Sequence, residues 1–378
     1  MSTPFEPAAG PRPPLELPTY VWEPTTDFLA ARYGLPHESI VRFDVNTSPV
    51  PPDLGDVLAG AFDPVLSEYP PSDYAPLVAA AAATYGMATD EILPTAGADE
   101  ALDLTARAYL REGSVAVGAV PTYAMYRIVT EQRGASFVPV PRLSRDEGFA
   151  LDLPALAEVA RSAQLLWLCE PNNPTGSAEP PTRIAELLAL LVRGAADDGR
   201  EPPMVAVDEA YAEFVDRSVL SLRSFYPRLV VIRTLSKAHA LAGARVGFAL
   251  ARPETLAPIL SYRAPASVGT VSAALATAAL RQPELAAANV ARVSSERTRL
   301  AGELAALGWW PYPSEANFIL FRFGDPDAAA TAAESLLRVG LVPRTFGTEH
   351  PLADCLRLTV RSVEENDRLI AAAREIPA

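Results

Sequence analysis

Short apolar segments alternate with helical patterns between about residues 75 and 250 of this chain. The apolar segments lack polar alternation, and intervening stretches such as 181–195 place apolar residues at helical spacing. Strands that are apolar on both faces and separated by helices indicate a mostly parallel sheet covered by helices on both faces. Six segments are predicted to be strands of this sheet: 114–120, 136–140, 165–169, 204–208, 229–234 and 245–251.

The pattern changes after about residue 270. A long Ala-rich helical stretch is followed by the apolar segments 316–323, 340–346 and 355–362, and then by a final helical pattern. This order is typical of a smaller α+β domain. We therefore expect an N-terminal arm and part of the small domain over 1–50, a large α/β domain over 51–268, and a small C-terminal domain over 269–378.

Composition narrows the class of protein. The 378 residues suffice for two domains, and a net charge of −14 argues against nucleic acid as a partner. No apolar run approaches the length of a membrane span, and the Pro-rich first eighteen residues do not resemble a signal peptide. Cys169 and Cys355 each lie in an apolar segment, which favours reduced cysteines in a cytoplasmic protein. The three histidines have no metal-ligand spacing, so we expect no metal site.

Lys237 is the only lysine among the 32 basic Lys and Arg residues of the chain. Arginine can replace lysine wherever a positive charge is sufficient, but a guanidinium stays protonated and cannot attack a carbonyl carbon. A single retained lysine therefore indicates a position where the chemistry needs a primary amine.

Further polar residues follow the predicted strands, where ligands of α/β proteins bind. Asp208 ends the apolar strand 204–208, and a carboxylate there is costly unless it meets a cation. The stretch 168–176 forms a turn after its strand and carries Asn173. The helix that begins near residue 97 offers free backbone N–H groups that suit a phosphate. Thr234, Ser236 and Arg245 around Lys237 complete an anion-binding set. Taken one at a time, these features also fit ordinary caps, turns and ion pairs.

Together these motifs resemble the fold-type I pyridoxal 5′-phosphate enzymes. Within them the chain is most similar to the class I/II aminotransferases and the histidinol-phosphate aminotransferase branch. The resemblance extends from about residue 40 to the C-terminus. It rests on seven segments in the family's order: EYPPSDYAPL, AGADEALDL, PTYAMY, PNNPTG, VDEAYAEF, TLSKAHALAGARVGF and LRLTVRSVEEN. It implies an aspartate-aminotransferase-like fold whose large domain binds the cofactor.

The resemblance implies a role for each matching residue. Lys237 would carry the cofactor and later move a proton, while Asp208 would keep the pyridine nitrogen protonated. Tyr211 and Asn173 would hydrogen-bond the ring hydroxyl oxygen, and Tyr123 would stack on the ring. The remaining implied contacts are Ala98, Asp99, Thr234, Ser236, Arg245 and a partner subunit's Tyr69 for the cofactor phosphate, and Arg357, Arg344, Asn46 and Tyr20 for the substrate.

Three departures from the branch concern substrate recognition. The stretch VNTSPVPP keeps Asn46 but differs at Thr47 and Ser48 from the usual sequence. Tyr20 matches an N-terminal tyrosine that enters the partner's site, but its flanking residues differ. Arg361 occupies a usual glycine position. It is expected either to pair with Glu364 or Glu365 or to reach the far end of a long substrate.

The resemblance implies a homodimeric aminotransferase that passes an amino group between two acids in ping-pong fashion, with histidinol phosphate and 2-oxoglutarate as the expected pair. An aromatic amino acid aminotransferase and a phospho-amino-acid decarboxylase are the alternatives. A non-enzymatic regulator of the same fold would need a basic DNA-binding domain. Neither the first 40 residues nor the net charge offers one.

Overall fold

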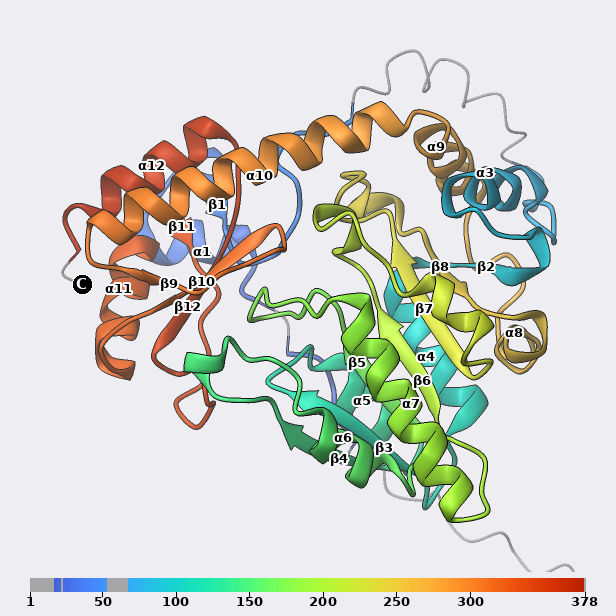
Figure 1. The fold of residues 1–378 in the computed structure, drawn as a ribbon. Helices are drawn as coiled ribbons and strands as arrows, with labels where there is room; N and C mark the ends of the chain where they lie inside the picture. Colours follow the sequence, from blue (N-terminus) through green and yellow to red (C-terminus); the bar gives the residue numbers. More distant parts are fainter. Residues whose placement is uncertain (1–16, 22, 53–66, 377–378) are drawn as a thin grey trace, which may run out of the picture.

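The computed structural model describes residues 17–21, 23–52 and 67–376, and its largest element is a seven-stranded sheet (Figure 1). All neighbouring strands are parallel except β8, which is antiparallel to both of its neighbours. The strands, in spatial order, are β2 (Ile92–Thr95), β8 (Gly247–Leu250), β7 (Leu229–Thr234), β6 (Met204–Asp208), β5 (Leu165–Cys169), β3 (Val115–Val120) and β4 (Ser136–Pro141). The expected mostly parallel sheet is confirmed, and β2 is an additional strand.

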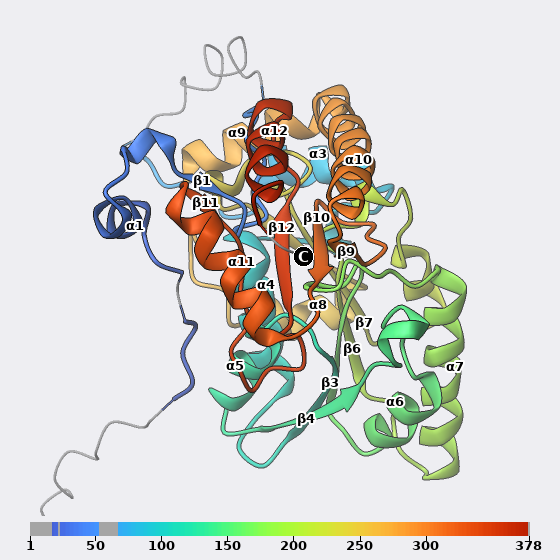
Figure 2. The ribbon, with the colours of Figure 1, turned by 90° about the vertical axis from the view of Figure 1, so that its left-hand side faces the viewer.

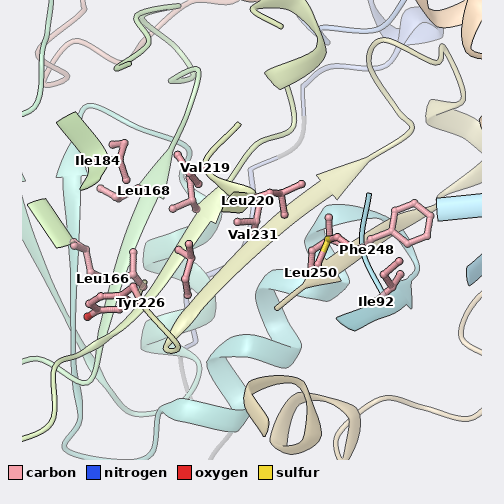
Figure 3. Close-up of a cluster of buried hydrophobic side chains, with 14 of the residues drawn as sticks. Ile92, Leu166, Leu168, Ile184, Val219, Leu220, Tyr226, Val231, Phe248 and Leu250 are labelled. Carbon is pink, nitrogen blue, oxygen red and sulfur yellow. The ribbon is translucent and has the colours of Figure 1, made fainter. Parts of the chain in front are cut away.

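Both faces of this sheet are buried, which explains why its central strands lack polar alternation. Along β5, Leu166 and Leu168 point into one apolar cluster, whereas Leu165 and Trp167 point into another. Figure 3 shows the first cluster, where Leu166, Leu168 and Val231 of the strands lie near Ile184 of a covering helix. A strand that is buried on both sides has no solvent-facing position for a polar residue.

Helices cover the sheet because each has one apolar face. In α7 (Pro181–Asp197), the buried residues Ile184, Leu187, Leu188 and Leu191 follow helical spacing, and a proline at the first position suits the helix start. The other helices of this part are α3 (Ala75–Tyr85), α4 (Gly97–Tyr109), α5 (Met125–Glu131), α6 (Leu153–Ala160), α8 (Pro253–Leu260) and α9 (Thr270–Leu280).

A second, smaller sheet lies beside the first and is antiparallel. It contains β12 (Cys355–Thr359), β10 (Phe318–Arg322) and β9 (Trp310–Pro311). Separately, β1 (Val41–Arg42) pairs in parallel with β11 (Leu341–Val342), so the chain near residue 42 joins the C-terminal part. Cys169 and Cys355 are both free and buried.

The helices of the C-terminal part pack around this smaller sheet, and α10 (Pro283–Ala306) extends from it toward α9 and α3 in Figure 1. In Figure 2, α11 (Pro326–Arg338) and α12 (Val363–Ala373) lie beside β12 and α10. Near the N-terminus, α1 (Thr26–Tyr33) contacts α11. No helix of the described residues is long and apolar enough to cross a membrane.

Gly247, at the start of β8, lets two backbone segments meet. A Cβ atom there would lie 2.6 Å from the carbonyl carbon of Gly97 and 2.8 Å from the amide nitrogen of Ala98, both at the start of α4. Backbone cannot rotate away from such a contact as a flexible side chain can. The approach therefore positions the first turn of α4 against the end of β7.

We expect Gly247→Ala to lower the free energy of unfolding by about 1–3 kcal/mol, because overpacking forces the backbone apart. Urea unfolding measures the change. Gly302→Ala is the matched control, since Gly302 lies exposed within α10 and a Cβ there meets nothing within 4 Å. The control is expected to gain about 0.5–1 kcal/mol. Equal stability of Gly247→Ala and the wild type would show that the contact imposes no constraint.

Candidate active site

A cavity of about 750 Å³ opens where β5, β6 and β7 end. The carboxyl ends of parallel strands meet at one edge of a sheet, so residues that follow different strands line the same space. Fourteen of the residues singled out from the sequence line it: Tyr20, Asn46, Ala98, Asp99, Tyr123, Asn173, Asp208, Tyr211, Thr234, Ser236, Lys237, Arg245, Arg344 and Arg357.

Asp208, the last residue of β6, is 4% exposed and lies at the base of the cavity. The Tyr126 hydroxyl donates to its Oδ2 at 2.9 Å, and the backbone N–H of Ala210 donates to its Oδ1 at 3.1 Å. Burial raises the pKa of Asp208 to about 6, although these two hydrogen bonds act in the opposite direction. Among the described residues no charged side chain forms an ion pair with this carboxylate, so it is suited to bind a cationic N–H group of a ligand.

Lys237 reaches the same cavity from the turn that follows β7. Burial, followed by the charge of Arg357, lowers the pKa of its amine to about 8. Its Nζ lies 5.6 Å from the centre of the Tyr211 ring. A lysine with this pKa is deprotonated often enough near neutral pH to act as a nucleophile or as a base.

Tyr211 is hydrogen-bonded to Asn46, which Thr359 holds in turn. The Asn46 side-chain amide donates to the Tyr211 hydroxyl oxygen at 3.0 Å. Asn46 in turn receives a hydrogen bond from Thr359 Oγ1 on its Oδ1 at 3.1 Å, and its own N–H donates to that hydroxyl at 3.0 Å. Asn46 has a φ of 53°, a left-handed conformation that asparagine tolerates better than most residues.

Arg357 of β12 is buried, and within the described part of the chain its side chain bonds to neutral acceptors. Its Nη1 donates to the Asn173 side-chain oxygen, and its Nη2 to the backbone oxygen of Asp44, both at 2.5 Å. Burial lowers the pKa of Arg357 to about 10. A buried guanidinium without a carboxylate partner in contact is suited to bind a carboxylate ligand in the bidentate manner.

An anion-binding cradle forms between the start of α4 and the loop after β7. A Cβ on Gly97 would lie 2.6 Å from the Arg245 guanidinium, so a side chain there would displace the guanidinium from this position. Arg245 donates to Asp99 Oδ2 at 3.2 Å. On the other side, the Thr234 hydroxyl donates to Ser236 Oγ at 2.9 Å. Hydroxyls, an arginine and a helix N-terminus together favour a phosphate group.

Aromatic rings form one wall of the cavity. The Tyr123 hydroxyl donates to Asp99 Oδ1 at 3.1 Å, and its ring packs edge-on against Tyr126 with centroids 5.8 Å apart. Tyr126 stacks on Trp167 at 5.6 Å. The Tyr20 ring lies 6.4 Å from that of Tyr123, so within one chain Tyr20 reaches its own cavity.

Two further residues from the sequence analysis lie elsewhere. Tyr69 is 89% exposed and outside this cavity, and its role toward a partner subunit stays a prediction. Arg361 pairs with Glu365 at 3.0 Å and does not line the cavity, so its expected pairing is confirmed. The described residues contain no group of three His, Cys, Asp or Glu side chains that could hold a metal ion.

Several polar residues of the site were missed by the sequence analysis. Tyr126 donates to Asp208, and the Asn289 amide of α10 donates to the backbone oxygen of Ala238 at 2.8 Å, next to Lys237. Asp44 and Glu23 pair with arginines that line the cavity. The contacts of Tyr126, Asn289 and Glu23 join segments that are brought together only by folding, so no local signal identifies these three residues.

The comparisons with known proteins agree with this geometry. The model of the family "Aminotransferase class I and II" matches residues 50–372. A histidinol-phosphate aminotransferase of Roseiflexus castenholzii is 37% identical over 358 residues, which cover 92% of each chain. One of Xanthomonas euvesicatoria is 40% identical over 312 residues, covering 80% of this chain and 83% of that one.

A solved structure extends the likeness to three dimensions. The histidinol-phosphate aminotransferase of Sinorhizobium meliloti, in complex with pyridoxal 5′-phosphate, superimposes with a TM-score of 0.84 at 27% identity, covering 96% of this chain and 95% of that one. The fold and the site thus define a fold-type I α/β enzyme. The chain belongs to the class I and II aminotransferases, and the family inferred from the seven motifs is confirmed.

The raised pKa of Asp208 predicts a stability cost in the ligand-free protein. Its carboxyl titrates at about 6 when folded, against 3.8 ordinarily, so the folded chain binds the proton more tightly than the unfolded chain. Stability therefore falls as the pH rises from about 4 to 6, and the full cost is present above pH 6.

We expect ligand-free Asp208→Asn to be more stable than the wild type by about 1–3 kcal/mol at pH 8, because asparagine removes the buried charge. The gain should shrink toward pH 4. Urea unfolding at both pH values measures it. A variant less stable than the wild type at pH 8 would contradict the cost assigned to the buried charge.

Proposed function

We propose that this chain binds pyridoxal 5′-phosphate covalently through Lys237 and transfers an amino group from histidinol phosphate to 2-oxoglutarate. One observation carries the proposal: the only lysine of the chain, with its pKa lowered to about 8, shares a cavity with the buried Asp208 and an anion cradle. The curated relatives that match most of this chain are histidinol-phosphate aminotransferases, which supports this donor.

The residues present fit the cofactor. The cradle at Gly97 and Arg245, together with Thr234 and Ser236, has the donors that a phosphate requires, and a side chain at Gly97 would fill it. The backbone N–H groups of Ala98 and Asp99, at the start of α4, belong to the same cradle.

The ring would be held by the other residues of the cavity. Asp208 would accept a hydrogen bond from a protonated ring nitrogen, which supplies the positive charge that its carboxylate lacks. Tyr123 would cover one face of the ring. Tyr211 and Asn173 would bind the ring hydroxyl oxygen, and Asn46 and Arg357 already orient their polar groups.

Lys237 and Asp208 divide the proton transfers between them. When bound, the cofactor supplies a carbonyl carbon for the donor's amino group and a ring that spreads the charge left at the donor's Cα. The Lys237 amine, with its lowered pKa, would remove the proton from the donor's Cα and deliver it to the carbon that was the cofactor's carbonyl carbon. Asp208 would keep the ring nitrogen protonated throughout, because the buried carboxylate is most stable beside a cation.

The substrate would be bound by two arginines on neighbouring segments. Arg357 would take the carboxylate of the acceptor acid, replacing its present neutral acceptors. Arg344, whose backbone pairs with that of Arg357, would bind the phosphate at the far end of the donor. Asn46 and Tyr20 line the cavity between these groups and the ring site.

We further propose a homodimer in the cytoplasm. The exposed Tyr69 would reach the cofactor phosphate in the partner subunit's site. The two free, buried cysteines are in keeping with a reducing compartment.

The covalent attachment can be tested directly. Borohydride reduction of the yellow holoenzyme is expected to leave one pyridoxyl group per chain, on the peptide that contains Lys237. Peptide mass spectrometry reads the position, and Lys237→Ala serves as the control without a side-chain amine. An unmodified Lys237 peptide after reduction would refute the attachment.

A panel of amino donors tests the substrate. We expect Arg344→Ala to cost about 2 kcal/mol or more in kcat/KM with histidinol phosphate, because a charged pair is lost, and much less with an unphosphorylated aromatic donor. Steady-state kinetics with both donors measure the difference. Equal losses, or no activity of the wild type with the phosphorylated donor, would favour the aromatic aminotransferase. Release of CO₂ without the spectrum of the amino form of the cofactor would favour a decarboxylase.

A further inference from the structure

The segment before α1 crosses the mouth of the cavity and contacts both parts of the chain. The backbone oxygen of Pro18 accepts a hydrogen bond from the Gln132 side chain, next to α5, at 3.0 Å. Tyr20 follows beside Tyr123, which lies in the loop between β3 and α5. Glu23 then reaches the opposite side, where its carboxylate forms an ion pair with Arg344 of the C-terminal part. Residues 17–21 and 23–25 thus form a strap across the entrance.

The ion pair places a carboxylate where the proposed donor would place its phosphate. Glu23 Oε1 meets Nη1 of Arg344, and the two side chains are 24% and 29% exposed. Burial to this degree weakens screening by water, so the attraction is stronger than that of a surface pair. The neighbouring Arg42 is engaged as well, since it pairs with Asp44 at 2.6 Å. An incoming phosphate therefore meets an arginine that already has a counter-ion.

A carboxylate and a phosphate cannot occupy the same side of one guanidinium without strong repulsion. A phosphate monoester carries about −1.5 to −2 charges near pH 7 and has three acceptor oxygens. It therefore attracts arginine more strongly than a single carboxylate does. A donor without a phosphate offers no such replacement and leaves the pair intact.

We propose that Glu23 is a displaceable counter-ion of Arg344 that competes with a phosphorylated donor for this arginine. The phosphate takes the place of Glu23, and the strap gives up its attachment to the C-terminal part while its attachment at Pro18 persists. Glu23 lowers the affinity for a ligand that places a phosphate at Arg344 and leaves the affinity for unphosphorylated donors unchanged. The identity of the donor rests on the proposed function, but the exchange of anions at Arg344 does not.

The test compares holoenzyme variants with inorganic phosphate as the probe, because the bound cofactor fills the inner cradle. Isothermal titration calorimetry is expected to show that Glu23→Gln binds phosphate about tenfold more tightly than the wild type, which corresponds to ~1.4 kcal/mol. Asp27→Asn is the matched control. It removes a carboxylate from the neighbouring helix α1 that is 90% exposed and pairs with His37. The control is expected to bind phosphate like the wild type.

Arg344→Ala and the double variant complete a cycle, since the effect of Glu23→Gln should disappear without Arg344. Kinetics supply a second readout: Glu23→Gln should lower KM for histidinol phosphate and leave KM for histidinol unchanged. Amide hydrogen exchange at Glu23 and Thr25 of the wild type should quicken when phosphate binds.

Equal phosphate affinity in Glu23→Gln and the wild type would overturn the inference. So would an equal gain in Asp27→Asn, or a gain that persists in the Arg344→Ala background. The proposed donor is judged separately by turnover of histidinol phosphate by the wild type. A wild type inactive with that donor, whose phosphate affinity nevertheless rises in Glu23→Gln, would reject the donor and support the counter-ion.

Discussion

The burial of a carboxylate at the end of a fully apolar strand is the constraint on which the site depends. All five residues of β6 are buried, and Asp208 is the last of them. Its two hydrogen bonds, from Tyr126 and from the backbone of Ala210, satisfy the oxygens but do not neutralise the charge. The folded chain therefore contains an unbalanced negative charge that a ligand with a cationic N–H group can balance.

The positive groups of the cavity are subject to the same cost, because a buried positive charge also needs a partner of opposite charge. Of the four arginines that line it within the described residues, Arg42, Arg245 and Arg344 each pair with a carboxylate, whereas Arg357 bonds to neutral oxygens. Because burial disfavours their charged forms, the pKa values of Arg357 and Lys237 are both lowered. Ligand groups of suitable charge would remove this cost, so electrostatic balance favours binding at these positions.

The site is also where the two sheets are joined. Asn46, β12 and the loop after β6 meet through the hydrogen bonds between Asn46, Thr359 and Tyr211. Tyr211 and Ala238 also belong to the apolar cluster around the smaller sheet, and Asn289 of α10 binds the backbone beside Lys237. The positions of Tyr211 and Lys237 consequently depend on the packing of the smaller sheet against the larger one.

The sequence by itself determined the architecture and most of the chemical groups. Continuous apolar segments separated by amphipathic helices determined the covered parallel sheet, and six of its seven strands lie where the pattern predicts them. The single lysine indicated a position that lies in the cavity, on the reasoning that arginine can replace lysine wherever only a charge is needed. The short strand β2, with Pro94 among its four residues, gave too little pattern to be detected, and no periodicity records that β8 runs antiparallel.

Only the tertiary structure decided which polar groups meet. Tyr126 and Asp208 are 82 positions apart in the chain, and Asn173 and Arg357 are 184 apart. The Glu23–Arg344 pair likewise joins segments from opposite ends of the chain. Local patterns determine whether a residue lies in a helix or a strand and which face is buried. The partner of a side chain depends instead on how whole elements pack, and the energies of these packed arrangements are not encoded in any local stretch of residues.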